Sequence, residues 1–276
     1  MLIDKQKYKK SLADLWHTVF GDGYGYINLI FKPEYDKDIL CFAELEDERA
    51  VSAFYLIKNT LRFDGKLYNG YYLYAAATLP EYRKCGIMSG LIRQAQAYCK
   101  EKETDFVNLV PSEESLYSYY SRFGFKDAMY RCKCKYKATD SSTQKLSAED
   151  IAEAQLIRQS YDGNMIFTEG QAFCYCRDCL EAAEITFTKL SDESGALFSA
   201  EEKLVLEFIS SERELNTSVE NLKNKLPCGE WEINSPFELP FCEENEKVRY
   251  GMLYPLSDEL RRDWSYTDIY MNIALD

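Results

Sequence analysis

The residues whose types and spacing point most clearly to chemistry lie between positions 71 and 92. A nearly apolar stretch, typical of a central strand, is followed by the turn Arg83-Lys84-Cys85-Gly86 and by a helical pattern that begins at Ile87. Backbone amides at a helix start favour an anion, and a glycine lets a ligand approach the backbone closely. Because Arg83 and Lys84 add positive charge, this turn is predicted to bind a pyrophosphate group.

The sequence around this turn resembles a known motif. Residues 74–92, YAAATLPEYRKCGIMSGLI, resemble motif A of the GNAT superfamily of acyl-CoA-dependent N-acyltransferases, whose signature is Arg/Gln-x-x-Gly-x-Gly/Ala. Arg83 and Gly86 match this signature, whereas Met88 stands where glycine or alanine is usual. Residues 116–125, LYSYYSRFGF, are similar to the family's helix that ends in Tyr-x-x-x-Gly-Phe. The two motifs follow each other at the family's spacing.

The resemblance implies where the cosubstrate acetyl-CoA binds. The strand at 74–79 would separate from its neighbour, and the amides of Ala77 and Leu79 would bond the pantetheine and the thioester carbonyl. The loop that follows would hold the pyrophosphate. The residues implied in acetyl-CoA binding are Ala77, Thr78, Leu79, Arg83, Lys84, Cys85, Gly86, Ile87, Met88 and Ser89. Tyr120 matches the family's general acid, which protonates the leaving CoA thiolate.

The general base is marked by no motif. An acceptor amine is mostly protonated at pH 7, so it must lose a proton before it attacks. Glu44, at the end of a predicted strand near motif A, is the first candidate, and a plain surface charge is the competing interpretation. The second candidate is the C-terminal carboxylate of Asp276, because some tandem GNAT proteins that resemble this chain bring their last residue into the N-terminal active site.

The elements around these motifs indicate two units, residues 1–137 and 145–276, joined by a polar stretch at 138–144. Each unit is expected to begin with two helices and to continue with strands and further helices. The predicted fold class is α/β (α+β), with two GNAT-like domains that each have a mixed, mostly antiparallel sheet flanked by helices. The second unit lacks the motif A turn, so it resembles a degenerate GNAT fold that walls the acceptor site.

Charge is distributed unevenly between these units. Residues 1–137 carry 21 Lys/Arg and 18 Asp/Glu, residues 138–276 carry 12 and 28, and the net charge is -13. A chain this acidic is a poor candidate for binding nucleic acid, which needs a basic surface. The acidic unit is predicted to select a cationic amine, and a merely solvated surface is the competing interpretation.

Ten cysteines and one histidine limit the remaining chemistry. The N-terminal MLIDKQKYKK lacks an apolar segment, so we expect no signal peptide, reduced thiols and a cytoplasmic location. No stretch is apolar and long enough to predict a membrane span. Cys174, Cys176 and Cys179 fall within one predicted helix without a clear fourth ligand, so we expect a buried helix face and no metal.

The sequence favours an N-acetyltransferase that moves acetyl from acetyl-CoA to a primary amine of a cationic small molecule, by direct attack in a ternary complex. A homo-oligomer is compatible with this interpretation. The rival is a non-catalytic acyl-CoA sensor or interaction protein on the same fold, which the departure at Met88 keeps open. A third possibility, an aminoacyl-tRNA-dependent transferase, fits less well, because such proteins usually lack a CoA-type motif A.

Overall fold

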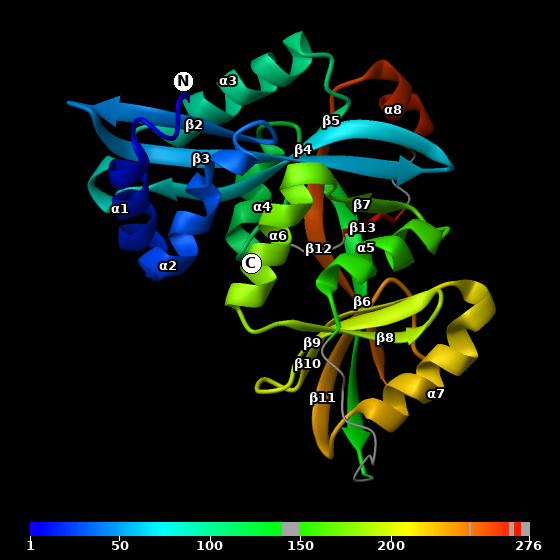
Figure 1. The fold of residues 1–276 in the computed structure, drawn as a ribbon. Helices are drawn as coiled ribbons and strands as arrows, with labels where there is room; N and C mark the ends of the chain where they lie inside the picture. Colours follow the sequence, from blue (N-terminus) through cyan, green and yellow to red (C-terminus); the bar gives the residue numbers. More distant parts are fainter. Residues whose placement is uncertain (140–148, 243, 265–267, 272–276) are drawn as a thin grey trace.

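The computed structural model describes residues 1–139, 149–242, 244–264 and 268–271 (Figure 1). The first half of the chain forms β1 (Leu2–Ile3), α1 (Lys9–Phe20), α2 (Tyr24–Ile27), the 3-10 helices η1 (Asn28–Phe31) and η2 (Pro33–Tyr35), β2 (Ile39–Glu46), β3 (Arg49–Phe63), β4 (Lys66–Thr78), η3 (Pro80–Tyr82), α3 (Ile87–Glu101), β5 (Phe106–Leu109), α4 (Glu114–Ser121) and β6 (Lys126–Ala138). The second half forms α5 (Ile151–Ser160), β7 (Met165–Phe167), α6 (Gly170–Ala182), β8 (Thr186–Ser191), β9 (Ser194–Ser199), β10 (Leu204–Ser210), η4 (Glu212–Glu214), α7 (Leu215–Lys225), β11 (Gly229–Ser235), β12 (Asn245–Pro255), α8 (Asp258–Asp263) and β13 (Tyr270–Met271).

The strands form one mixed sheet that runs through both halves. Its order is β1-β2-β3-β4-β5-β12-β6-β11-β10-β9-β8, while β7 pairs with β3 and with β13. Most neighbours are antiparallel, and β4–β5, β10–β11 and β7–β13 are parallel pairs. This confirms the predicted fold class, a mixed α/β fold with a mostly antiparallel sheet flanked by helices.

Strand β12 comes from the second half of the chain but lies between two strands of the first half. Met252 on β12 is opposite Leu109 on β5, and Leu253 is opposite Lys126 on β6. Figure 1 shows β6 and β12 running from the upper part of the molecule to the lower part. The two halves therefore share strands, which the order of the elements alone does not reveal.

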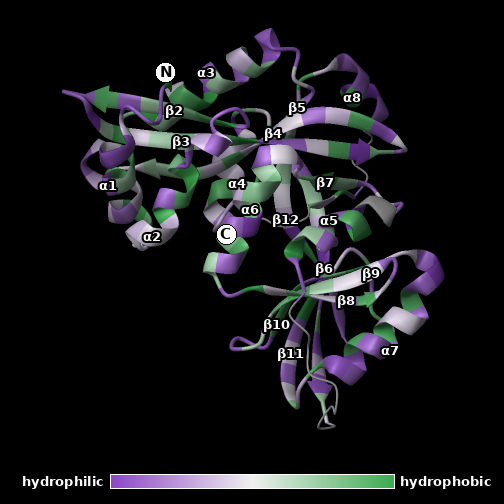
Figure 2. Ribbon diagram, viewed as in Figure 1, coloured by the Kyte–Doolittle hydropathy of each residue, from purple (hydrophilic) through white to green (hydrophobic). Residues whose placement is uncertain are grey.

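The sheet in the first half separates two hydrophobic cores. On β3, Tyr55 and Ile57 pack with α1 and α2, whereas Phe54 and Leu56 pack with α3 and α4. This alternation is expected, because successive side chains of a strand point to opposite faces. The flanking helices carry hydrophilic and hydrophobic bands in Figure 2, as expected for helices with one exposed and one buried face.

One pair of cysteines departs from the expectation of reduced thiols. Cys134 on β6 forms a disulfide with Cys242, 108 positions further along the chain. Both residues belong to the core that α7 covers, so the fold brings together two residues that no local pattern connects. Of the three cysteines predicted on one buried face of α6, Cys176 and Cys179 are free thiols buried in a hydrophobic core, whereas Cys174 is a free thiol only half-buried against that core.

Helix α6, from the second half of the chain, packs against the first half. The Asp178 carboxylate accepts hydrogen bonds from Lys32 Nζ and from the Tyr35 hydroxyl, the latter at 2.6 Å. The ring of Tyr175 packs edge-on against Tyr35 and Tyr74, with ring centroids 5.8 and 6.5 Å apart. The middle of α6 thus lies beside β4. Among the helices of the described residues, none is long and apolar enough to cross a membrane.

Candidate active site

Strands β4 and β5 separate at the centre of the first half. Their parallel pairing covers only residues 70–72 of β4 and ends where Tyr72 is opposite Asn108. Beyond this point β4 has an irregularity, because Ala53 and Tyr55 of β3 face Ala77 and Tyr74, and Ala75 has a positive φ of 50°. The predicted separation of this strand from its neighbour is confirmed.

The direction of the β4 amides decides which of them a ligand can use. The Leu79 amide donates to the Val51 carbonyl of β3 at 3.0 Å, so its predicted bond to acetyl-CoA conflicts with this hydrogen bond. Amide direction alternates along an antiparallel ladder, so the Ala77 amide also points toward β3. The Thr78 amide, between Ala77 and Leu79 on the regular part of the ladder, points away from β3 instead.

The turn after β4 leaves several backbone amides exposed at a helix start. Lys84 and Gly86 have positive φ angles of 64° and 80°, and Gly86 is the N-cap of α3 without a side-chain hydrogen bond at the cap. The first hydrogen bond inside the helix is donated by the Gly90 amide to the Gly86 carbonyl at 3.0 Å. The preceding amides, those of residues 87–89, have no partner within the helix. This arrangement favours an anion.

The side chains of this turn are mostly exposed. Arg83, Lys84 and Cys85 are exposed, and Arg83 Nε donates to the Thr78 carbonyl at 3.1 Å, which holds the turn against the end of β4. Met88 packs partly against the core on the α3 side.

Tyr120 lies at the opening between β4 and β5. It projects from α4, is only 7% exposed, and lines a cavity of about 450 Å³ together with Tyr74, Ala75 and Ala76. Burial raises the pKa of the Tyr120 phenol well above its usual range, so the group stays protonated at neutral pH. Within the described part of the chain its hydroxyl has no hydrogen-bond partner. It can therefore donate a proton to a group in the cavity.

The carboxylate of this cavity is Asp22, which sequence reasoning missed. Asp22 lines the cavity and accepts a hydrogen bond from Trp16 Nε1 at 2.7 Å. The predicted base Glu44 does not line it; it lies on β2, near the N-terminal amino group of Met1. Asp276 lies outside the described residues. No motif marks Asp22, because only folding brings the end of α1 to the opening.

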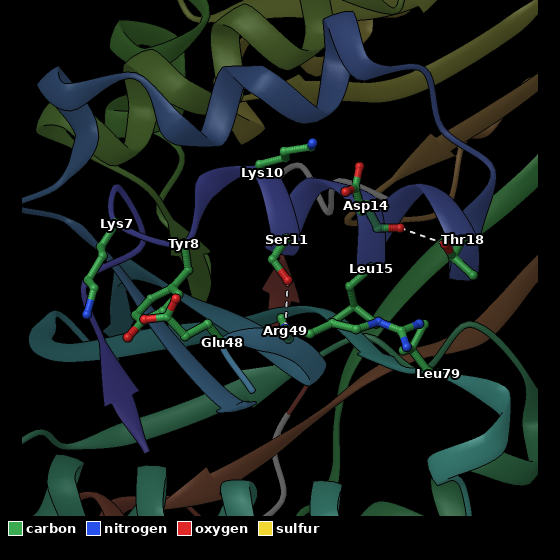
Figure 3. Close-up of a pocket in the computed structure, with 11 residues that line it drawn as sticks. Lys7, Tyr8, Lys10, Ser11, Asp14, Leu15, Thr18, Glu48, Arg49 and Leu79 are labelled. Atoms are coloured by element: carbon green, nitrogen blue, oxygen red, sulfur yellow. Dashed lines mark hydrogen bonds between the residues drawn. The ribbon is translucent and has the colours of Figure 1, made fainter. Parts of the chain in front are cut away.

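A separate cavity lies beside α1 (Figure 3). It has a volume of about 360 Å³, and Figure 3 shows Ser11 and Leu15 pointing from α1 toward the sheet while Lys10 and Asp14 point away. Of the predicted acetyl-CoA residues, only Leu79 lines it, and none of them lines the cavity that contains Tyr120. We place the candidate active site at the opening between β4 and β5 because Tyr120 and Asp22 line that cavity.

Comparison with known proteins agrees with this geometry. Residues 4–128 match the family model of the acetyltransferase (GNAT) domain. The protein has a GNAT fold. No curated protein matches the sequence. The GNAT match includes the opening, the turn before α3 and Tyr120.

Solved structures resemble the chain beyond this domain. A probable N-acyltransferase from Enterococcus faecalis V583 matches with a TM-score of 0.71 and 14% identity, covering 93% of this chain and 72% of its own. A GCN5-related N-acetyltransferase from Kribbella flavida gives a TM-score of 0.70 and 14% identity with the same coverage. Eis1 from Mycobacterium abscessus gives 0.66 and 11%, covering 92% and 73%. The similarity in fold therefore includes the second half.

Proposed function

We propose that the protein is an N-acetyltransferase that moves acetyl from acetyl-CoA to a primary amine of a cationic small molecule. The observation that carries this proposal is the cavity at the opening of β4, which is lined by the buried phenol of Tyr120 and by the carboxylate of Asp22. A proton donor and a proton acceptor thus meet where a strand has exposed backbone amides. Acyl transfer to an amine needs these groups.

In this proposal acetyl-CoA binds along the open edge of β4. Its pyrophosphate would lie at the free amides of residues 87–89, with Arg83 and Lys84 close in sequence to supply positive charge. The Thr78 amide would bond the pantetheine or the thioester carbonyl. The thioester would then reach the cavity lined by Tyr120.

These two side chains account for the proton transfers that the reaction needs. The Asp22 carboxylate accepts a proton from the ammonium form of the acceptor, and the free amine attacks the thioester carbonyl. A carbon–nitrogen bond forms and the carbon–sulfur bond breaks. The Tyr120 phenol gives its proton to the leaving thiolate and regains one from the amide nitrogen or solvent, so the products are the N-acetyl amine and CoA. No covalent acyl-enzyme is needed.

Support for a cationic acceptor comes from Asp22 and from the acidic second half of the chain. Incubating the purified protein with acetyl-CoA and a panel of neutral and polycationic amines tests the proposal. Release of CoA together with an acetylated amine is the expected result. The rival, a non-catalytic acyl-CoA-binding protein, predicts that acetyl-CoA binds while every amine remains unmodified.

A further inference from the structure

A second cavity adjoins the candidate active site. Its volume is about 370 Å³, and Tyr26 and Ala183 line both this cavity and the one that contains Tyr120. Arg131 on β6 and Asn234 on β11 belong to the same wall, on the sheet face opposite the core that α7 covers. The two cavities therefore lie next to each other, on either side of Tyr26 and Ala183.

Two buried side chains of this cavity keep an unused hydrogen-bond acceptor. Glu207 is 4% exposed and Asn234 is 3% exposed. Glu207 Oε2 accepts two hydrogen bonds from Arg158, at 2.7 and 3.0 Å, but Glu207 Oε1 and Asn234 Oδ1 have no partner in the described part of the chain. A buried acceptor without a donor costs free energy, so the two oxygens favour a ligand that donates hydrogen bonds, such as an ammonium group.

The same cavity also holds an unused donor. Arg131 Nε has no hydrogen-bond partner within the described residues, and its guanidinium lies 4.2 Å from the centroid of the Tyr250 ring. Tyr270 lines the same cavity, and both Glu207 and Arg131 act electrostatically on its phenol. A ligand with both an ammonium group and a carboxylate would satisfy all of these unused atoms.

We infer that the second cavity binds the zwitterionic head of an α-amino acid. The α-ammonium group would lie at Glu207 and Asn234, and the α-carboxylate at Arg131. The identity of the acceptor rests on the proposed acetyl transfer. The substrate would be an amino acid with a side-chain amine, and this amine would extend past Tyr26 to reach Tyr120. A simple diamine is the weaker fit, because it leaves the Arg131 guanidinium without an anion.

Binding of matched probes tests this inference without any reaction. L-Lysine is compared by calorimetry with cadaverine, which lacks its carboxylate, and with 6-aminohexanoate, which lacks its α-amine; L-ornithine, putrescine and 5-aminopentanoate form a shorter series. Because a charged hydrogen-bonded contact is lost in each truncated probe, at least one amino acid should bind about tenfold more tightly than both of its counterparts. Equal or tighter binding of the diamines, or no binding of either amino acid, would overturn the inference.

Two variants assign the two ends of the probe. Arg131→Gln should abolish the preference for lysine over cadaverine and keep the preference over 6-aminohexanoate, whereas Glu207→Gln should do the reverse. Lys135→Gln and Glu230→Gln are matched controls, because these exposed residues lie on β6 and β11 outside the cavity. Glu207→Gln leaves Arg158 without its counter-charge, so the folding of this variant is checked by its Tm. The comparison of probes on the wild-type protein does not depend on this variant.

Failure of this inference and failure of the proposed function give different results. If lysine or ornithine binds with the expected preference but no amine is acetylated, the second cavity is an amino acid site and the transferase proposal fails. If diamines are acetylated while neither amino acid binds, the transferase proposal stands and the amino acid site is contradicted.

Discussion

Tyr120 and Asp22 line one cavity from opposite faces of the sheet. Asp22 is held by Trp16, which belongs to the core on the α1 side, whereas Tyr120 belongs to the core on the α3 side. The cavity can join the two faces because β4 and β5 separate beyond Tyr72. An acyl donor and an amine that approach from opposite faces would meet at this opening.

Replacing the proposed general acid should lower turnover. Tyr120→Phe keeps the buried ring and removes only the proton donor, so we expect kcat to fall by about 100-fold or more with the Kd for acetyl-CoA nearly unchanged. Steady-state kinetics and calorimetry measure the two quantities. Tyr98→Phe is the matched control, because Tyr98 packs against Phe42 and does not line the cavity. Unchanged turnover in Tyr120→Phe would contradict the assignment.

Replacing the proposed base should make the rate depend more steeply on pH. Asp22→Asn can keep the hydrogen bond from Trp16 but cannot take a proton from the ammonium group, so kcat/KM should fall roughly 10- to 100-fold at pH 7. The loss should shrink as pH rises toward the pKa of an alkyl amine, about 10.4. Asp14→Asn, on the exposed side of α1, should behave like wild type. A loss that stays constant with pH would argue against proton acceptance by Asp22.

The Lys84 side chain should act on the pyrophosphate alone, whereas Arg83 also holds the turn to β4 through the Thr78 carbonyl. Lys84→Gln should weaken acetyl-CoA binding by roughly three- to tenfold, because one charged contact is lost. A truncated donor, S-acetylpantetheine, has no pyrophosphate, so Lys84→Gln and wild type should use it equally well. If the variant also lost activity with the truncated donor, the turn would have another role.

The stabilisation that the contact between α6 and the first half of the chain provides should be lost at acid pH. Burial alone would raise the pKa of Asp178, but hydrogen bonds from Lys32 and Tyr35 lower that pKa overall. A lowered pKa stabilises the fold above about pH 4, the range of a free aspartate, and this stabilisation disappears as pH falls through the folded-state value. Asp178→Asn should reduce the free energy of unfolding by about 1–3 kcal/mol at pH 7.

Denaturant titrations at pH 7 and pH 3 measure this effect. The difference between Asp178→Asn and wild type should be largest at pH 7 and should become small at pH 3. Glu181→Gln serves as the control, because its carboxylate lies on the same helix, is 57% exposed and pairs only within that helix. A difference of the same size at both pH values would show that Asp178 stabilises the fold without its charge.

The resemblance to the GNAT motifs pointed to the parts of the site that are contiguous in sequence. The turn before α3, the helix with Tyr120 and the separation of β4 all follow from one segment of chain. The direction of the Leu79 amide was not predictable, because it depends on the register between β3 and β4. The role of Asp22 and the insertion of strand β12 could not be predicted for the same reason, since each reaches its place through contacts between distant segments. Short elements such as β7 carry too little periodicity to be recognised.

The most direct test of the central claim is a mass-spectrometric assay of wild-type protein with acetyl-CoA and a panel of amines that includes L-lysine and L-ornithine. The account predicts that an amine gains one acetyl group as CoA is released, and that Tyr120→Phe slows this transfer about 100-fold or more. Tight binding of acetyl-CoA with no acetylated amine would contradict the account, and so would an equal rate in the Tyr120→Phe variant.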